Sequence, residues 1–209
     1  PGVEVRPSGC READCAVTWD GEAPLQMDQM VVDFILDAAL TWSDGEPVST
    51  EDSVRSFQLA DHPQAPGPHW AEDRTESYLA LDSRTVQWVG RPGFTTGDLR
   101  PFFWVPLPGH VLEGAQDWGE IAASASWADA PPSYGPFQIQ TREGGQIRLS
   151  PNLHYFRVEE GLPLLDELIF TQVEGGREAA LQALQTGDCD ILDSSFGWEN
   201  DPQLLSQIR

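Results

Sequence analysis

The stretch "LTWSDGEPVSTEDSVRSF", residues 40–57, carries three structural signals close together. An apolar start runs into Trp42, Asp44-Gly45 forms a tight turn, and Pro47 keeps the chain extended after it. A capped helix follows at once. The stretch therefore predicts a strand that turns and becomes a helix over a short distance.

The start of this helix is marked by polar residues. Ser49 or Thr50 can cap it, and Glu51 and Asp52 lie in its first turn, where the helix dipole favours acidic side chains. Three apolar residues then share one face at helical spacing: Val54, Phe57 and Ala60. We interpret the turn as a structural connection between strand and helix.

Two further segments in this half have the period-two pattern of strands. Residues 27–36 place four apolar side chains on one face: Met30, Val32, Phe34 and Leu36. In residues 83–90, Val86 and Trp88 alternate with Thr85, Gln87 and Val89. Residues 61–77 are rich in proline and polar residues, which predicts a surface loop. Residues 100–114 contain three prolines and cannot form a long helix, although a short helix fits His110–Leu112.

The second half begins with a clear hairpin at residues 129–152. Apolar alternation on each side flanks the turn "REGG", residues 142–145. A strand is predicted at 165–173 and a helix in "GGREAALQALQTGDCDIL", where Ala180, Leu181 and Leu184 form the apolar side and Gly187 ends the helix. Cys189, Ile191 and Leu192 predict another buried strand. The order of elements favours a mixed α/β or α+β fold.

The composition bounds the function. The 209 residues include 34 acidic and 12 basic residues, for a net charge of -22, and every basic residue is arginine. A phosphate backbone would be repelled, so nucleic acid is excluded as a partner. The acidity is either a solvated surface or an attraction for cationic ligands. No apolar run is long enough to span a membrane. The chain begins without a leader, and we expect its start to be an interior cut or a mature end.

Cysteines and histidines give no metal signature. Cys10 and Cys15 have a spacing that a small disulfide loop can close, but the sequence does not settle the pairing. Cys189 is interpreted as a small buried apolar residue. A metal at Cys10 and Cys15 is disfavoured, because no second Cys/His pair stands at a matching spacing. His62 and His69 are either metal ligands or loop residues, and we interpret them as loop residues. We therefore expect neither a metal nor a cofactor.

Catalytic motifs are missing from the sequence. It contains no nucleophile elbow, P-loop, dinucleotide fingerprint or zinc-protease motif. Several aromatic residues stand in loops rich in proline and glycine, where they either line a ligand cleft or fill a core at loop crossings. They are Trp104, Trp127, Tyr134, Phe196 and Trp198.

Four segments together resemble the extracellular solute-binding proteins of ABC transporters, family 5, which bind dipeptides, oligopeptides or nickel. The strand, turn and helix of residues 40–57 are similar to a signature of that family, as are "YGPFQIQTREGGQIRLSPNLHYF", "LPLLDELIFTQV" and "REAALQALQTGDCDIL". The segments occur in the family's order. One departure is Pro151-Asn152, which reverses the usual Asn-Pro, and residues 1–26 have no counterpart that we can place.

The resemblance implies a fold and a domain organisation. It implies a partial lobe of the type II periplasmic-binding-protein fold with the family's extra small subdomain. Residues 1–128 would form that small subdomain, rich in strands with short helices, and residues 129–209 part of the main α/β subdomain. The second lobe would be absent, because members of the family are much longer and have two lobes.

The resemblance also implies a function. The protein would capture a solute, most readily a peptide, between two lobes by hinge closure. It would deliver the solute to the permease subunits of an ABC importer. It would act in the periplasm or at the outer face of the cell membrane, held there at most by the transporter or by a lipid anchor outside this chain, and would not be an enzyme. We expect six residues near the lobe junction to contact the ligand by stacking or hydrogen bonding: Trp127, Tyr134, Ser194, Ser195, Phe196 and Trp198.

Two other classes of function remain open from the residues alone. A secreted hydrolase would use paired acidic residues, although no defined pair stands out. An acidic surface module would bind partners through its charge. A second lobe in the parent protein would favour transport, whereas a catalytic domain would favour the enzyme.

Overall fold

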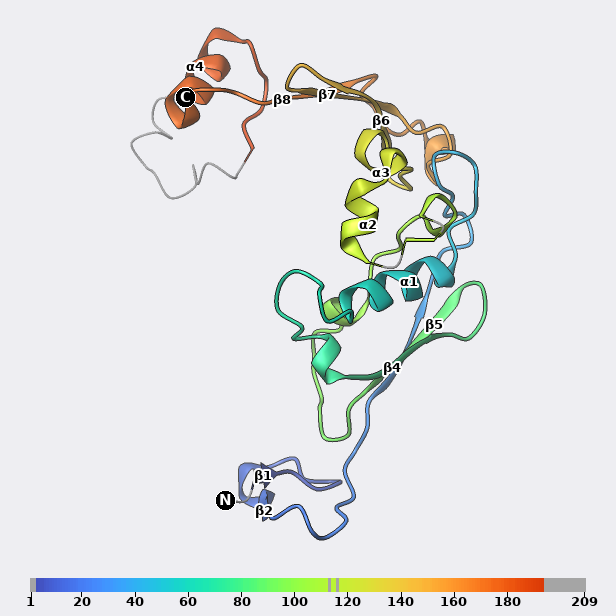
Figure 1. Ribbon diagram of the computed structural model, residues 1–209, viewed down its shortest axis with the longest axis vertical. Helices are drawn as coiled ribbons and strands as arrows, with labels where there is room; N and C mark the ends of the chain where they lie inside the picture. Colours follow the sequence, from blue (N-terminus) through green and yellow to red (C-terminus); the bar gives the residue numbers. More distant parts are fainter. Residues whose placement is uncertain (1–2, 113, 116, 194–209) are drawn as a thin grey trace.

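The computed structural model describes residues 3–112, 114, 115 and 117–193. Along the length of the molecule lie a small N-terminal hairpin, a three-stranded sheet with a helix beside it, and a second three-stranded sheet (Figure 1). All strand pairs in these residues are antiparallel. The fold is therefore mixed α/β, with helices added to antiparallel sheets.

The N-terminal hairpin pairs β1 (Val3–Val5) with β2 (Val17–Trp19), and the short 3-10 helix η1 (Ala13–Cys15) lies between them. Cys10 and Cys15 form a disulfide, which answers the question that their spacing left open. Asp28 holds the start of the disulfide loop, because it accepts hydrogen bonds from the Ser8 hydroxyl (2.5 Å), just before the loop, and from the Arg11 guanidinium (2.6 Å), within it.

The central sheet has the order β3-β5-β4, formed by β3 (Val31–Ile35), β4 (Thr75–Ala80) and β5 (Thr85–Gly90). The predicted alternation is confirmed, since Val86 and Trp88 are fully buried. β3 is shorter than the predicted strand at 27–36. The predicted loop at 61–77 is wrong at its end, where the chain forms η2 (Glu72–Arg74) and then enters β4. The Thr75 hydroxyl at the start of β4 accepts a hydrogen bond from the Trp88 indole of β5, which ties this polar residue to the sheet.

Helix α1 (Thr50–Ala60) lies beside this sheet (Figure 1). Val54, Phe57 and Ala60 pack towards the sheet as predicted. A second face is buried more deeply and is polar. Ser53 contacts the Tyr78 hydroxyl and donates to the Trp104 carbonyl, and Ser56 donates to the Val105 carbonyl at 2.6 Å. Hydrogen bonds therefore join α1 to the proline-rich segment that crosses it.

That proline-rich segment runs as short turns. It contains η3 (Arg100–Phe102) and η4 (Gly109–Val111), and the second of these confirms the short helix expected near His110. Phe102 is fully buried against Trp88, with ring centroids 4.5 Å apart. α2 (Trp118–Ala123) and α3 (Ala125–Asp129) follow and lead towards the second sheet (Figure 1).

The second sheet has the order β6-β7-β8, from β6 (Phe137–Glu143), β7 (Gln146–Pro151) and β8 (Leu168–Thr171). The predicted hairpin is confirmed. Its turn residues Gly144 and Gly145 have φ of 58° and 75°, a conformation that glycine adopts without strain. The chain between β7 and β8 contains η5 (Val158–Glu160). β8 is shorter than the predicted strand at 165–173.

The last described helix is α4 (Gly176–Thr186), and it ends at Gly187 as predicted. The buried strand predicted at Cys189, Ile191 and Leu192 is wrong. No strand forms there, Ile191 is 84% exposed and Cys189 is half-buried. A strand needs a neighbour for its backbone hydrogen bonds, and no other strand of the described chain pairs with this segment.

Trp42 is 2% exposed and packs with Leu36 and Val48. We expect Trp42→Ala to lower the free energy of unfolding by roughly 3–5 kcal/mol, because it removes a large buried ring and leaves a cavity. Urea denaturation followed by circular dichroism measures this. Leu164→Ala, at a residue 84% exposed, serves as the control and should change stability by less than about 0.5 kcal/mol. Equal stability of wild type and Trp42→Ala would contradict the prediction.

The Asp52 carboxylate is buried and accepts hydrogen bonds from the Ser49 backbone (2.9 Å), the Gly109 backbone (3.0 Å) and the Trp42 indole (3.2 Å). Asp52→Asn keeps the shape of the side chain, but its NH₂ group cannot accept the hydrogen bonds that these N–H groups donate. We expect a loss of about 1–3 kcal/mol in the same denaturation experiment. Asp73→Asn, on an exposed side chain, is the matched control, and an equally small effect at both positions would refute the role given to Asp52.

Candidate functional site

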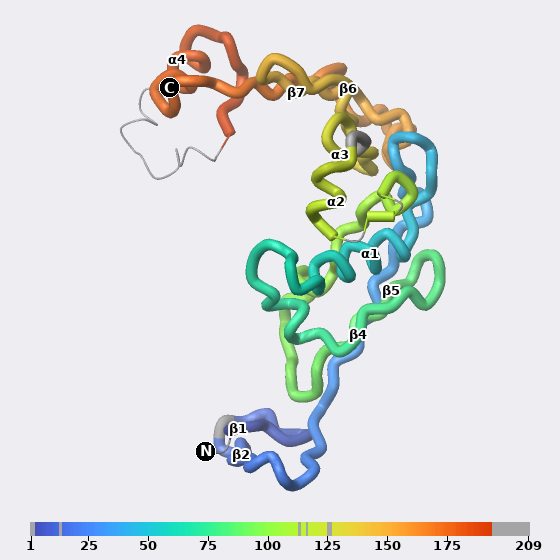
Figure 2. The backbone as a smooth tube through the Cα atoms, in the orientation of Figure 1, coloured from blue at the N-terminus to red at the C-terminus, as the bar shows by residue number. Residues whose placement is uncertain are grey.

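Three distant segments meet at the turn that follows Trp42. The Tyr134 ring packs edge-on against Trp42 with centroids 5.1 Å apart, and His110 Nε2 lies 2.6 Å from Asp44 Oδ2. A side-chain carbon added at Gly45 would lie 3.6 Å from the His154 ring. The backbone trace shows the same convergence at the upper right, where the blue turn meets the later segments (Figure 2). We call this meeting point the turn junction.

Asn152 fixes the far side of the turn junction. It is fully buried, and its Nδ2 donates to the carbonyls of Ser133 (3.2 Å) and Gly135 (2.9 Å), while its Oδ1 accepts from the His154 backbone at 2.9 Å. Asn152 thus has a structural role. It holds the segment before β6 and the segment after β7 together.

The turn junction has a defined charge pattern. Burial acts to raise the pKa of Asp44, but the hydrogen bonds from His110 and from the Glu46 backbone outweigh it and lower that pKa below its ordinary value of 3.8. Asp44 is thus a carboxylate at neutral pH. Burial raises the pKa of Tyr134, so its hydroxyl stays neutral and able to donate a hydrogen bond.

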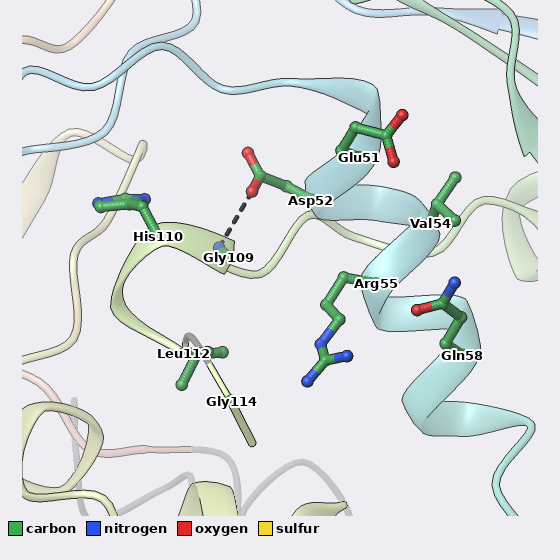
Figure 3. A pocket seen from close by; sticks show the side chains of 9 residues that line it. All are labelled: Glu51, Asp52, Val54, Arg55, Gln58, Gly109, His110, Leu112 and Gly114. Atoms are coloured by element: carbon green, nitrogen blue, oxygen red, sulfur yellow. Dashed lines mark hydrogen bonds between the residues drawn. The ribbon is translucent and has the colours of Figure 1, made fainter. Parts of the chain in front are cut away.

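A hollow of about 430 Å³ lies beside the turn junction (Figure 3). One wall is α1, which contributes Glu51, Arg55 and Gln58, and the other wall is the segment that begins at Gly109. A second hollow of about 290 Å³ shares Leu112 with it and extends towards α2. The walls combine charged groups of both signs with apolar side chains, which is the lining expected of a site for a small polar molecule.

The described part of the chain contains two of the six predicted ligand-binding residues. Tyr134 lies in the turn junction, half-buried on Trp42, and Trp127 lies in α3, half-buried against the cluster of Leu59, Leu112 and Ile121. These two therefore pack against separate clusters. Trp104, the other loop aromatic that the structure describes, belongs to the central core.

The other four predicted ligand-binding residues lie outside the described residues: Ser194, Ser195, Phe196 and Trp198.

Sequence reasoning missed the hollow and its arginine. Glu51 was interpreted only as a helix-start residue, and Arg55 was not singled out. The available signal was their spacing of four on one helix, which places both side chains on the same face. The opposite wall was not foreseeable, since Gly109 comes from a proline-broken segment whose path the sequence pattern does not define.

Neither a metal centre nor a membrane helix is found in the part of the chain that the structure describes. Within residues 3–112, 114, 115 and 117–193, no three potential ligands among His, Cys, Asp and Glu group around a common point. Over the same residues, no helix has the length and apolar character needed to cross a membrane.

Comparison with known sequences identifies the family. A family model described as "Bacterial extracellular solute-binding proteins, family 5 Middle" matches residues 24–208, which includes the turn junction and the hollow. The chain belongs to this family. Its members are solute-binding proteins of ABC transporters and not enzymes, which confirms the resemblance and removes the hydrolase alternative. No curated protein sequence matches the chain.

Solved structures share the fold. Lactococcal OppA, complexed with an endogenous peptide, matches with a TM-score of 0.65 and 18% identity, over 85% of this chain and 38% of that one. CtaP from Listeria monocytogenes matches with a TM-score of 0.60 and 23% identity, over 76% of this chain and 32% of that one. NikZ from Campylobacter jejuni, in complex with Ni(L-His), matches with a TM-score of 0.57 and 18% identity, over 96% of this chain and 39% of that one. This chain thus spans about a third of the length of these proteins.

The lowered pKa of Asp44 predicts how stability depends on pH. A carboxyl group whose pKa is depressed by folding adds stability above its unfolded pKa, and this contribution is lost as the pH falls through the folded pKa. We therefore expect wild type to lose stability relative to Asp44→Asn as the pH falls below 3.8. Thermal unfolding at a series of pH values measures this. Glu76→Gln, at an exposed residue of β4, is the control, and parallel curves for wild type and Asp44→Asn would contradict the prediction.

Proposed function

We propose that the protein containing this chain captures a peptide outside the cytoplasm and delivers it to the permease subunits of an ABC importer. The family match over residues 24–208 is the observation that carries this proposal. One structure of the same fold holds an endogenous peptide, and another holds a nickel–histidine complex. The peptide is the solute we favour, and the nickel complex is the alternative within the family.

In this proposal the chain supplies most of one lobe of a two-lobed protein. Residues 1–128 form a small subdomain and residues 129–209 part of the main one, a division supported by the separate central and second sheets. The two subdomains meet at the turn junction. The solute is held between this lobe and a second one that closes by a hinge. The protein acts in the periplasm or at the outer membrane face, where a lipid anchor outside this chain can hold it.

Trp127 and Tyr134 are proposed to contact the solute, together with Ser194, Ser195, Phe196 and Trp198. The Tyr134 hydroxyl and the Trp127 indole nitrogen make no hydrogen bond within the described residues, although both rings are anchored by packing. A ring fixed on one side with an unused polar tip suits ligand contact, because binding then orders few additional groups.

Native mass spectrometry of the gently purified full-length protein tests the ligand class. We expect released masses of peptides, and thermal stabilisation of the emptied protein by peptides, because a ligand that binds only the folded state raises its stability. A nickel or other non-peptide mass would overturn the peptide assignment and keep the family. An empty protein that no peptide, sugar or nickel complex stabilises would overturn solute capture itself.

Tyr134→Phe tests the proposed ligand contact in the full-length protein. The variant keeps the ring on Trp42 and removes only the hydroxyl, so we expect unchanged stability and peptide affinity about 2–10-fold weaker. Calorimetric titration with the co-purified peptide measures the affinity. Tyr155→Phe, at a tyrosine whose ring packs on Phe156, is the matched control. An affinity equal to wild type would remove Tyr134 from the site.

A further inference from the structure

The hollow beside α1 contains a half-buried arginine without a partner. Arg55 extends from α1 across the hollow towards the segment that carries Leu112 and Gly114 (Figure 3). Its side chain makes no hydrogen bond, ion pair or ring contact within the described residues. Removing a guanidinium from water has a cost, and here no protein group compensates for it.

Other arginines of the described chain show how unusual this is. In a chain with 34 acidic and 12 basic residues, a carboxylate is readily available to most cations. Apart from Arg55, only Arg6 and Arg91 have unengaged side chains among the residues that the structure describes, and both are exposed. Four arginines form ion pairs with carboxylates, namely Arg11, Arg100, Arg148 and Arg157.

An acidic residue stands in the ideal position to pair with Arg55 and does not. Glu51 lies four residues before it on α1, the orientation that most favours a helical ion pair. Its carboxylate nevertheless points away from Arg55, towards the start of the helix (Figure 3). It also makes no hydrogen bond or ion pair in the described part of the chain. The hollow therefore has an unused cation within it and an unused anion at its rim.

We propose that this hollow binds a small zwitterion that carries a free carboxylate and a free ammonium, namely an amino acid or a short peptide. The guanidinium of Arg55 matches the two oxygens of a carboxylate, and Glu51 receives the ammonium. Gln58 also lines the hollow, and its side-chain amide offers the ligand both a hydrogen-bond donor and an acceptor. The volume of about 430 Å³ is within the range of small-molecule sites.

The charge of the whole chain selects among ligands. A net charge of -22 repels a free anion, which would otherwise be the simplest ligand for an unpaired arginine. A zwitterion has no net charge and escapes that repulsion. This site is formed by α1 and the segment that carries Gly109, Leu112 and Gly114, and Leu112 also belongs to the cluster on which Trp127 packs. Its proposed ligand-binding groups, Arg55 and Glu51, are not among the proposed solute contacts, so it is a second site beside them and its existence does not depend on the proposed function.

Nuclear magnetic resonance of the 209-residue chain tests the proposal with L-alanyl-L-alanine as the probe. We expect saturable shifts of the amides of residues 51–58 and 109–112 and of the Arg55 Nε–Hε resonance. N-acetyl-L-alanine lacks the ammonium and L-alaninamide lacks the carboxylate. Each should bind about tenfold more weakly, as expected when one charged hydrogen-bonding end is lost.

Three variants make the test specific. Arg55→Gln should abolish saturable binding and Glu51→Gln should weaken it about tenfold. Arg91→Gln, which removes the same charge at an exposed residue, should leave it unchanged. A well-dispersed amide spectrum shows that each variant is folded.

Three results would overturn the proposal. The first is binding of L-alanyl-L-alanine that Arg55→Gln does not affect. The second is no saturable binding of L-alanyl-L-alanine. If Glu51→Gln then shifts the Arg55 Nε–Hε resonance in the absence of ligand, Glu51 and Arg55 simply pair with each other in solution. Equal affinity for N-acetyl-L-alanine would refute the zwitterion and indicate a carboxylate site.

Discussion

The buried Asp52 carboxylate is the constraint on which the first half of the chain depends. It joins the Trp42 indole, the start of α1 and the Gly109 backbone through hydrogen bonds of 2.9–3.2 Å. A buried carboxylate without such donors would be strongly unfavourable, so the three elements are held in one relative arrangement. The turn junction and the hollow both lie around this residue. Their geometry therefore follows from a single acidic side chain one turn into a helix.

Local patterns predicted most of the elements and few of the contacts between them. Three elements could be predicted because each depends on neighbours in the sequence: the capped helix, the alternation of Val86 and Trp88, and the Gly144-Gly145 hairpin. The burial of the α1 serines could not be predicted. Ser53 and Ser56 bond to carbonyls about fifty residues away, at Trp104 and Val105, and such partners leave no periodic signal.

The same distinction applies to the candidate sites. Trp127 and Tyr134 could be proposed from the sequence because they are large aromatic residues in segments rich in proline and glycine. Their role as ligand contacts stays a prediction. Arg55 was missed because one charged residue in an acidic helix is ordinary in sequence. It becomes unusual only when the structure shows that its side chain is half-buried and makes no hydrogen bond or ion pair within the described residues. The strand expected near Ile191 failed for a related reason, since a strand is defined by a neighbour that its own residues do not specify.

The Cys10–Cys15 disulfide lies before residue 24, where the family match begins. The hairpin that it closes has only four apolar side chains on its paired strands, and Val3 is 61% exposed, so packing alone contributes little to holding it together. A crosslink of this kind forms and persists in oxidising compartments and is reduced in the cytosol. Recombinant material made in a reducing cytoplasm would therefore differ from secreted material at its N-terminus, while the α1 region, which lacks cysteine, would be the same in both.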